Sequence, residues 1–131
     1  NLGIKAQIVG ADGWDGAVSV AGNDASAIEG VIFINQYSPD MESVQDIMKK
    51  YKEKFGTDIN SFGINAYDST MLLLQTIEKV GSLKASDIVK GIASTDYKGI
   101  LGSISFDSNG DPIKEPVFVQ IKNGQYTTYK K

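Results

Sequence analysis

The chain has 131 residues, of which 41% are hydrophobic and 22% charged, with a net charge of −3; these values are ordinary for one globular domain or part of one. All 13 basic residues are lysine, so the arginine-rich basic face of a nucleic-acid-binding protein is missing. Cysteine and histidine are absent, which excludes thiol nucleophiles, disulfides, Cys/His zinc sites and the commonest general base. We therefore expect no metal, no cofactor and no catalytic residues.

The first third of the chain predicts two short strands separated by a small-residue segment. Residues 6–9 form an apolar run that ends in a glycine-containing turn at 10–13, and residues 14–22 predict a short helix. Residues 31–34 (Val-Ile-Phe-Ile) are apolar at every position, which predicts a strand buried on both faces. The first five residues are typical of a helix end running into a strand, so we expect the protein to extend upstream.

Three helices are predicted in the middle of the chain. Ser38 is a suitable cap and Pro39 a suitable first residue for a helix that continues to residue 55, with one apolar stripe. A second helix begins at residue 60 or 61 and ends at 80, before a glycine. A third covers 85–93. The lysines between positions 49 and 54 fit a solvated helix face better than a phosphate site.

The last part of the chain predicts antiparallel strands. Apolar residues alternate over 103–106 and 117–121, and the pair Asn123-Gly124 predicts a tight hairpin turn with 125–129 as the returning strand. Residues 107–111 resemble a calcium loop, but their glycine and acidic residues do not match its spacing, so a hairpin turn is predicted instead. The element order indicates an α/β fold: a parallel sheet flanked by helices, plus C-terminal antiparallel strands.

The turn at 10–13 is the one candidate site that the residues themselves suggest. It lacks the third glycine of a dinucleotide fingerprint and the Lys-Ser/Thr of a phosphate loop. Asp12 is either an ordinary carboxylate near a helix N-terminus or a side chain that projects from a strand end into a cleft, where it would suit an ammonium group. Trp14 is either the wall of such a pocket or a loop anchor.

Five segments, in order, resemble the leucine/isoleucine/valine-binding proteins of branched-chain amino-acid ABC transporters. The segments are 2–14 (Leu-Gly-Ile-Lys-Ala-Gln-Ile-Val-Gly-Ala-Asp-Gly-Trp), 28–31 (Ile-Glu-Gly-Val), 51–58 (Tyr-Lys-Glu-Lys-Phe-Gly-Thr-Asp), 66–69 (Ala-Tyr-Asp-Ser) and 99–111 (Gly-Ile-Leu-Gly-Ser-Ile-Ser-Phe-Asp-Ser-Asn-Gly-Asp). The resemblance covers essentially the whole chain and corresponds to the C-terminal portion of the family's type I periplasmic-binding fold.

The resemblance implies how the chain is divided and where its site lies. Residues 1–35 would belong to the second lobe, 36–115 to the first lobe, and 116–131 to strands that cross back. Asp12, flanked by Gly13, aligns with the carboxylate that receives the ligand's α-ammonium group. A cleft aromatic of the family aligns with Phe62, and Trp14 is added to the predicted ligand-binding residues because it lies close to Asp12 in sequence.

The function implied is a non-enzymatic extracytoplasmic receptor, in the periplasm or at the cell surface, with a lipid anchor left open. It would bind a branched-chain or other small apolar amino acid and deliver it to an ABC-transporter permease. Further expected partners are the missing N-terminal portion and, for the isolated fragment, a second copy in a swapped homodimer, since strand edges such as 31–34 would be unpaired. No nucleic-acid partner is expected.

Three alternatives to an amino-acid receptor for uptake remain. The chain could be the ligand-sensing domain of a signalling receptor, or a receptor for amides, urea or aromatic acids. The third is an enzyme, a flavodoxin-like hydrolase or nucleotide binder, which the missing His, Cys and phosphate-loop residues disfavour.

Overall fold

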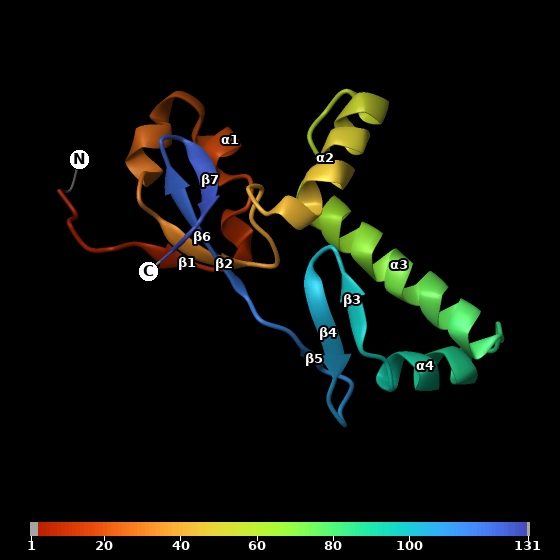
Figure 1. Ribbon diagram of the computed structural model, residues 1–131. Helices are drawn as coiled ribbons and strands as arrows, with labels where there is room; N and C mark the ends of the chain where they lie inside the picture. Colours follow the sequence, from red (N-terminus) through yellow and green to blue (C-terminus); the bar gives the residue numbers. More distant parts are fainter. Residues whose placement is uncertain (1–2, 131) are drawn as a thin grey trace. The chain divides into compact units, whose positions relative to one another are not determined.

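A computed structural model describes residues 3–130 of the protein (Figure 1). The chain divides into two compact units, which we call unit 1 (residues 1–50 and 116–131) and unit 2 (51–115). The elements, in chain order, are β1 (Val9–Gly10), η1 (Asp12–Trp14), α1 (Ala17–Ala21), η2 (Gly22–Ile28), β2 (Ile32–Asn35), α2 (Glu42–Phe55), α3 (Ser61–Val80), α4 (Ala85–Ala93), β3 (Tyr97–Gly99), β4 (Gly102–Phe106), β5 (Pro112–Ile113), β6 (Val117–Lys122) and β7 (Gln125–Thr128). Helices and strands together confirm the predicted α/β class.

Unit 1 is built on a mixed sheet with the strand order β1-β2-β6-β7. The pair β1–β2 is parallel, whereas β2–β6 and β6–β7 are antiparallel. The predicted C-terminal hairpin is confirmed, and Asn123 and Gly124 take positive φ angles of 53° and 69°, as a tight two-residue turn requires. The sheet therefore joins the beginning of the chain to its end.

One face of this sheet carries the core of unit 1. Val31, Phe33, Val119 and Ile121 are each at most 1% exposed. Side chains from η1, α1 and η2 pack against them, as does Tyr126 from β7. Helical cover on this side explains why a small unit of short strands buries these four side chains.

The opposite face of the sheet is apolar and uncovered in unit 1. Val9 is 71% exposed, and the paired residues Ile34 and Phe118 are 43% and 48% exposed. The prediction that 31–34 is buried on both faces is therefore wrong for unit 1, because the helices of this unit cover a single face.

The segment before this strand is also more broken than its sequence pattern suggests. The predicted strand over 6–9 is reduced to Val9–Gly10. The predicted helix over 14–22 is divided into η1 and α1, because Gly16 between them has a left-handed φ of 89° that does not continue a helix. Residues after Ala21 continue as the 3-10 helix η2.

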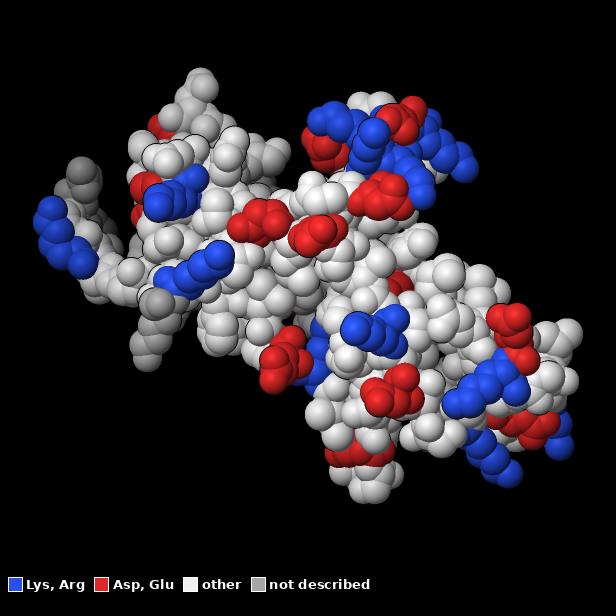
Figure 2. Space-filling model, in the orientation of Figure 1, with Lys and Arg blue, Asp and Glu red and all other residues white. Residues whose placement is uncertain are grey.

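Helix α2 begins at Glu42, later than the predicted start at Pro39. Residues 38–41 form a turn instead, closed by the Met41 N–H donating to the Ser38 carbonyl at 3.0 Å. Its lysines are exposed, and acidic side chains are interspersed among them (Figure 2). Lys50 pairs with Asp46 and Lys52 with Asp58 at 2.6 and 2.9 Å, which fits the predicted solvated face.

Unit 2 packs α4 on α3 beside the sheet β3-β4-β5. The predicted bounds of α3 are confirmed: the Asn60 side chain accepts a hydrogen bond from the Gly63 N–H at 3.0 Å, and Gly81 ends the helix with a φ of 62°. A Cβ atom added at Gly91 of α4 would lie 2.7 Å from Thr76 of α3, so glycine permits the close approach of the two helices.

The segment that resembles a calcium loop is a hairpin turn between β4 and β5, as predicted. Asp107 Oδ1 accepts hydrogen bonds from the N–H groups of Asn109 and Asp111 at 2.8 and 2.9 Å. The N–H of Asp107 donates to the Asp111 carbonyl at 2.9 Å. The hydrogen bonds that the carboxylate accepts, from Asp111 first and then from Asn109, lower the pKa of the Asp107 carboxyl group. The carboxylate therefore closes its own turn.

Candidate functional site

The candidate site is the turn formed by residues 11–15, which we call the Asp12 turn. It leaves the carboxyl end of β1, the edge at which ligands bind in open α/β sheets. The Trp14 N–H donates to the Ala11 carbonyl at 3.1 Å and the Asp15 N–H to the Asp12 carbonyl at 2.9 Å, so the backbone is closed locally. The Asp12 side chain is exposed and makes no hydrogen bond or ion pair within residues 3–130. A carboxylate in this state can accept hydrogen bonds from a cationic group.

Gly13 and Trp14 complete the turn in different ways. Gly13 is exposed, and nothing lies within 4 Å of a Cβ atom added there. The Trp14 indole folds back over Gly10, where an added Cβ atom would overlap the ring. Trp14 also packs against the buried core of unit 1. These contacts support the loop-anchor interpretation of Trp14, and its contact with a ligand stays a prediction.

A hollow of about 650 Å³ lies beside the turn. Its volume is within the range of small-molecule sites, and its wall is mostly apolar. The residues that line it come from the turn and the helices after it: Ala11, Gly13, Trp14, Asp15, Gly16, Ala17, Val20, Ala21 and Ile28. Asp15 contributes the one carboxylate of this lining.

Two tyrosine hydroxyls lie near Asp15, and the sequence pattern did not indicate either of them. Burial, followed by the negative charge of Asp15, raises the pKa of Tyr37 to about 12. Burial and then Asp15 also raise the pKa of Tyr126. Both hydroxyls therefore keep their protons at neutral pH and remain hydrogen-bond donors. Tyr126 comes from β7, more than 100 residues after the turn, so no local signal could have found it.

Phe62 is the second residue of α3 and is 82% exposed. It belongs to unit 2, whereas the Asp12 turn belongs to unit 1. The ring is therefore largely in solvent, and its predicted place at the ligand stays a prediction.

Asp68 in unit 2 also belongs to a segment that resembles the amino-acid-binding proteins, but its surroundings differ from those of Asp12. Asp68 is 8% exposed. It accepts hydrogen bonds from the Tyr97 hydroxyl and the Ile100 N–H, both at 3.0 Å, and from the Leu101 N–H at 3.3 Å. A Cβ atom at Gly99 would overlap the carboxylate, so glycine is required there. Hydrogen bonds to Asp68 thus join the segments 66–69 and 99–111.

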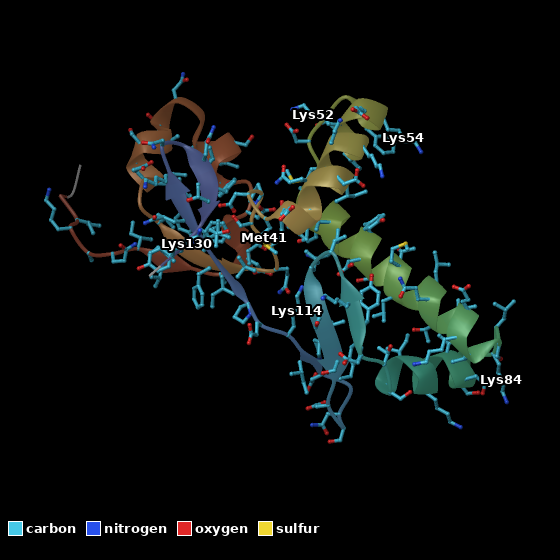
Figure 3. All side chains as sticks on the ribbon, in the orientation of Figure 1. Met41, Lys52, Lys54, Lys84, Lys114 and Lys130 are labelled. Carbon is cyan, nitrogen blue, oxygen red and sulfur yellow. The ribbon has the colours of Figure 1, made fainter. Side chains whose placement is uncertain are left out.

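Lys114 lies close enough to Asp68 for the charge of the carboxylate to affect the pKa of its ammonium group. The Lys114 side chain is labelled in Figure 3. Burial lowers the pKa of its ammonium group, and the negative charge of Asp68 acts in the opposite direction. Among the described residues no group of three or more His, Cys, Asp or Glu side chains could hold a metal ion.

None of the described helices is both long and apolar enough to cross a bilayer.

Comparison with known proteins places these features in a family. The family model described as "Periplasmic binding protein" matches residues 1–125. The Leu/Ile/Val-binding protein homolog 2 of Brucella abortus is 27% identical over 139 aligned residues, which cover 98% of this chain and 36% of that protein. Glutamate receptor 2.4 of Arabidopsis thaliana is 32% identical over 69 residues, which cover 52% of this chain and 8% of that protein.

Among solved structures, a leucine-binding protein of Thermotoga maritima superposes with a TM-score of 0.80 and 31% identity. The match covers 98% of this chain and 38% of the Thermotoga protein. The chain therefore spans little more than a third of the bacterial relatives it matches. Its mixed sheet and helices correspond to part of the type I periplasmic-binding fold. The chain belongs to the periplasmic binding protein family, whose members bind solutes and are not enzymes.

Proposed function

We propose that the chain is part of an extracytoplasmic receptor that binds a branched-chain or other small apolar amino acid for uptake through an ABC-transporter permease. The observation that carries the proposal is the exposed Asp12 carboxylate at the carboxyl end of β1, without a partner among the described residues. It occurs in a chain 31% identical to a leucine-binding protein. In this proposal Asp12 accepts hydrogen bonds from the ammonium group of the ligand, Gly13 leaves room beside it, and Trp14 contributes apolar wall. The family resemblance implies a ligand contact for Phe62 as well.

The two units support the proposed division of the chain between two lobes. The backbone leaves unit 1 after residue 50 and returns at 116, as expected of a chain that runs from the second lobe (1–35) into the first (36–115) and crosses back (116–131). Residues 36–50 group with unit 1, whereas the resemblance assigns them to the first lobe, so the exact junction between the proposed lobes stays a prediction. Closure of two lobes about such crossings would bury a ligand.

The uncovered face of the unit 1 sheet supports the proposed partners. In a protein of the relatives' length, the portion that this chain lacks covers Val9, Ile34 and Phe118. The isolated chain covers them with a second copy, because an exposed apolar sheet face favours self-association, as do the edges of β1 and β7, beside which no further described strand lies. Light scattering of the isolated chain should give a dimer, and Phe118→Glu should shift it to a monomer. If the wild-type chain is a monomer at every accessible concentration, the predicted homodimer is wrong.

A signalling role is the second candidate, and the similarity to a plant glutamate receptor favours it. The same Asp12 turn would then sense an amino acid rather than deliver it. A transmembrane or kinase segment encoded in the same gene would decide for this role. A permease gene beside it would decide for uptake.

A thermal-shift screen identifies the ligand. The longest protein that the gene encodes, and the isolated chain, are screened against the common amino acids, amides, urea and aromatic acids. A ligand at a hundred times its dissociation constant adds about 2.7 kcal/mol of stability. We expect a shift with a small apolar amino acid in the longer protein. A shift only with amides, urea or aromatic acids would replace the ligand class, and no shift with any of these compounds would contradict the proposal.

A further inference from the structure

The Asp12 turn is weakly held by its own neighbours in sequence. Strand β1 has two residues and lies at the edge of the sheet, paired with β2 on one side. Helix α1, which follows the turn, has five residues, and no side chain of its preceding residues caps it. A short edge strand and a short helix do not fix a carboxylate well. Contacts from elsewhere in unit 1 are therefore needed to define the position of the turn.

The hydroxyl group of Tyr126 supplies such contacts. It accepts a hydrogen bond from the Val18 N–H at 2.9 Å and donates one to the Trp14 carbonyl at 3.4 Å. Val18 is the second residue of α1, and its N–H is one of the helix-terminal groups that have no partner within the helix. Tyr126 thus acts as a cap from a distant strand and bridges both ends of residues 14–18.

The ring of Tyr126 is itself fixed in the core. It contacts Phe33 edge-to-face, with 5.8 Å between ring centroids and an interplanar angle of 81°. Phe33 is 1% exposed, so the ring rests on a rigid part of the sheet. Since the ring cannot easily move, the position of the hydroxyl is defined by the sheet rather than by the turn.

Strand β7, which carries Tyr126, is held at both ends by carboxylates. The Glu29 side chain accepts hydrogen bonds from the N–H groups of Asn123 and Gly124 at 2.8 and 3.4 Å, at the hairpin that begins β7. At the other end the Asp40 side chain accepts from the Thr128 N–H at 2.9 Å and from its hydroxyl at 2.6 Å. Charge-assisted hydrogen bonds of this kind are the stronger ones in proteins.

We propose that Tyr126 is a positioning residue of the amino-acid site: its hydroxyl, on a strand held by Glu29 and Asp40, sets the Asp12 turn so that the Asp12 carboxylate meets the ligand's ammonium group. The inference rests on the proposed function, which it deepens. A tyrosine that only fills the core would stabilise unit 1 without any effect specific to Asp12.

The test is calorimetric titration of leucine into the longest protein that the gene encodes. Tyr126→Phe keeps the ring and removes the hydroxyl. We expect leucine to bind about three- to tenfold more weakly, the effect of losing one or two hydrogen bonds. Tyr129→Phe is the matched control, because it removes a hydroxyl close by in the same segment that no described hydrogen bond joins to the turn. Its affinity should equal that of the wild type.

A double-mutant cycle with Asp12→Asn separates positioning from general stability. If Tyr126 acts through Asp12, the loss caused by Tyr126→Phe should shrink to less than about twofold in the Asp12→Asn protein. An undiminished loss in that background, or no loss in the wild-type background, overturns the proposal.

Hydrogen exchange tests the same positioning without a ligand. In the isolated chain, the Val18 amide should exchange about tenfold faster in Tyr126→Phe and be unchanged in Tyr129→Phe. An unchanged Val18 amide overturns the positioning role, whether or not any amino acid binds. Accelerated exchange together with no amino-acid binding in the longer protein would overturn the proposed function and with it the role of Tyr126 at a ligand.

Discussion

Asp12 in unit 1 and Asp68 in unit 2 both belong to segments that resemble amino-acid-binding proteins, and the structure places them in opposite environments. Asp12 is exposed on a short turn and makes no side-chain hydrogen bond within residues 3–130. Asp68 is buried and accepts from three donors of the β3–β4 hairpin region. Burial and satisfied hydrogen bonds mark a structural carboxylate, whereas an exposed carboxylate at a strand end is available to a ligand.

The same difference separates stability from binding. Removing Asp68 leaves buried N–H and hydroxyl donors without partners, which lowers the free energy of unfolding. Removing Asp12 leaves no described donor unpaired. We therefore expect substitutions around Asp68 to change stability and substitutions around Asp12 to change binding.

The largest expected effect on stability is that of Asp68→Ala. It should lower the free energy of unfolding by about 3 kcal/mol, because several buried donors lose their acceptor. Asp12→Ala is the matched control and should change it by less than about 0.5 kcal/mol. Urea denaturation of the isolated chain measures both. Equal losses for the two variants would remove the distinction between the carboxylates.

The next effect is that of Gly99→Ala. The added methyl group would overlap the Asp68 carboxylate and the Tyr97 ring, so we expect a loss of about 2 kcal/mol in the free energy of unfolding. Gly13→Ala, where the new Cβ atom meets nothing within 4 Å, should have little effect on stability. A Gly99→Ala protein as stable as the wild type would show that the contact between Gly99 and Asp68 can relax without cost.

A smaller effect should appear at high pH. Burial, followed by the hydrogen bond to Asp68, raises the pKa of Tyr97 from 10.0 to about 12. The unfolded chain therefore releases this proton at lower pH than the folded one, and the stability contributed below pH 10 is lost as the pH rises toward 12. Denaturation curves at intervals across this range should show a shallower decline for Tyr97→Phe than for the wild type. An identical decline would mean that folding does not raise the pKa of Tyr97.

Where the sequence pattern is local, it predicted the structure well. Asn60 and Gly81 are a cap and a stop for α3, and both act at the predicted positions. Asn123-Gly124 forms the predicted hairpin because each residue readily takes a positive φ. These signals depend on backbone preferences within a few residues, so they are visible without the rest of the fold.

Features that depend on distant contacts were not predictable. The placement of β6 beside β2 joins residues more than 80 positions apart. The helix expected over 14–22 is broken at Gly16, where Tyr126 from β7 caps the new helix start. The exposure of Ile34 follows from helices that cover a single face of the sheet in unit 1. No periodicity in the sequence carries this information.

The most direct test of the account is leucine binding by the longest protein that the gene encodes, measured by calorimetry for Asp12→Asn and for Asp24→Asn. Asp24 is an exposed carboxylate of unit 1 outside the Asp12 turn and is the matched control. We predict that Asp12→Asn binds leucine at least about thirtyfold more weakly, because the ammonium group loses its charged partner, and that Asp24→Asn binds as the wild type does. Equal affinity in all three proteins would contradict the assignment of Asp12 as the ammonium acceptor.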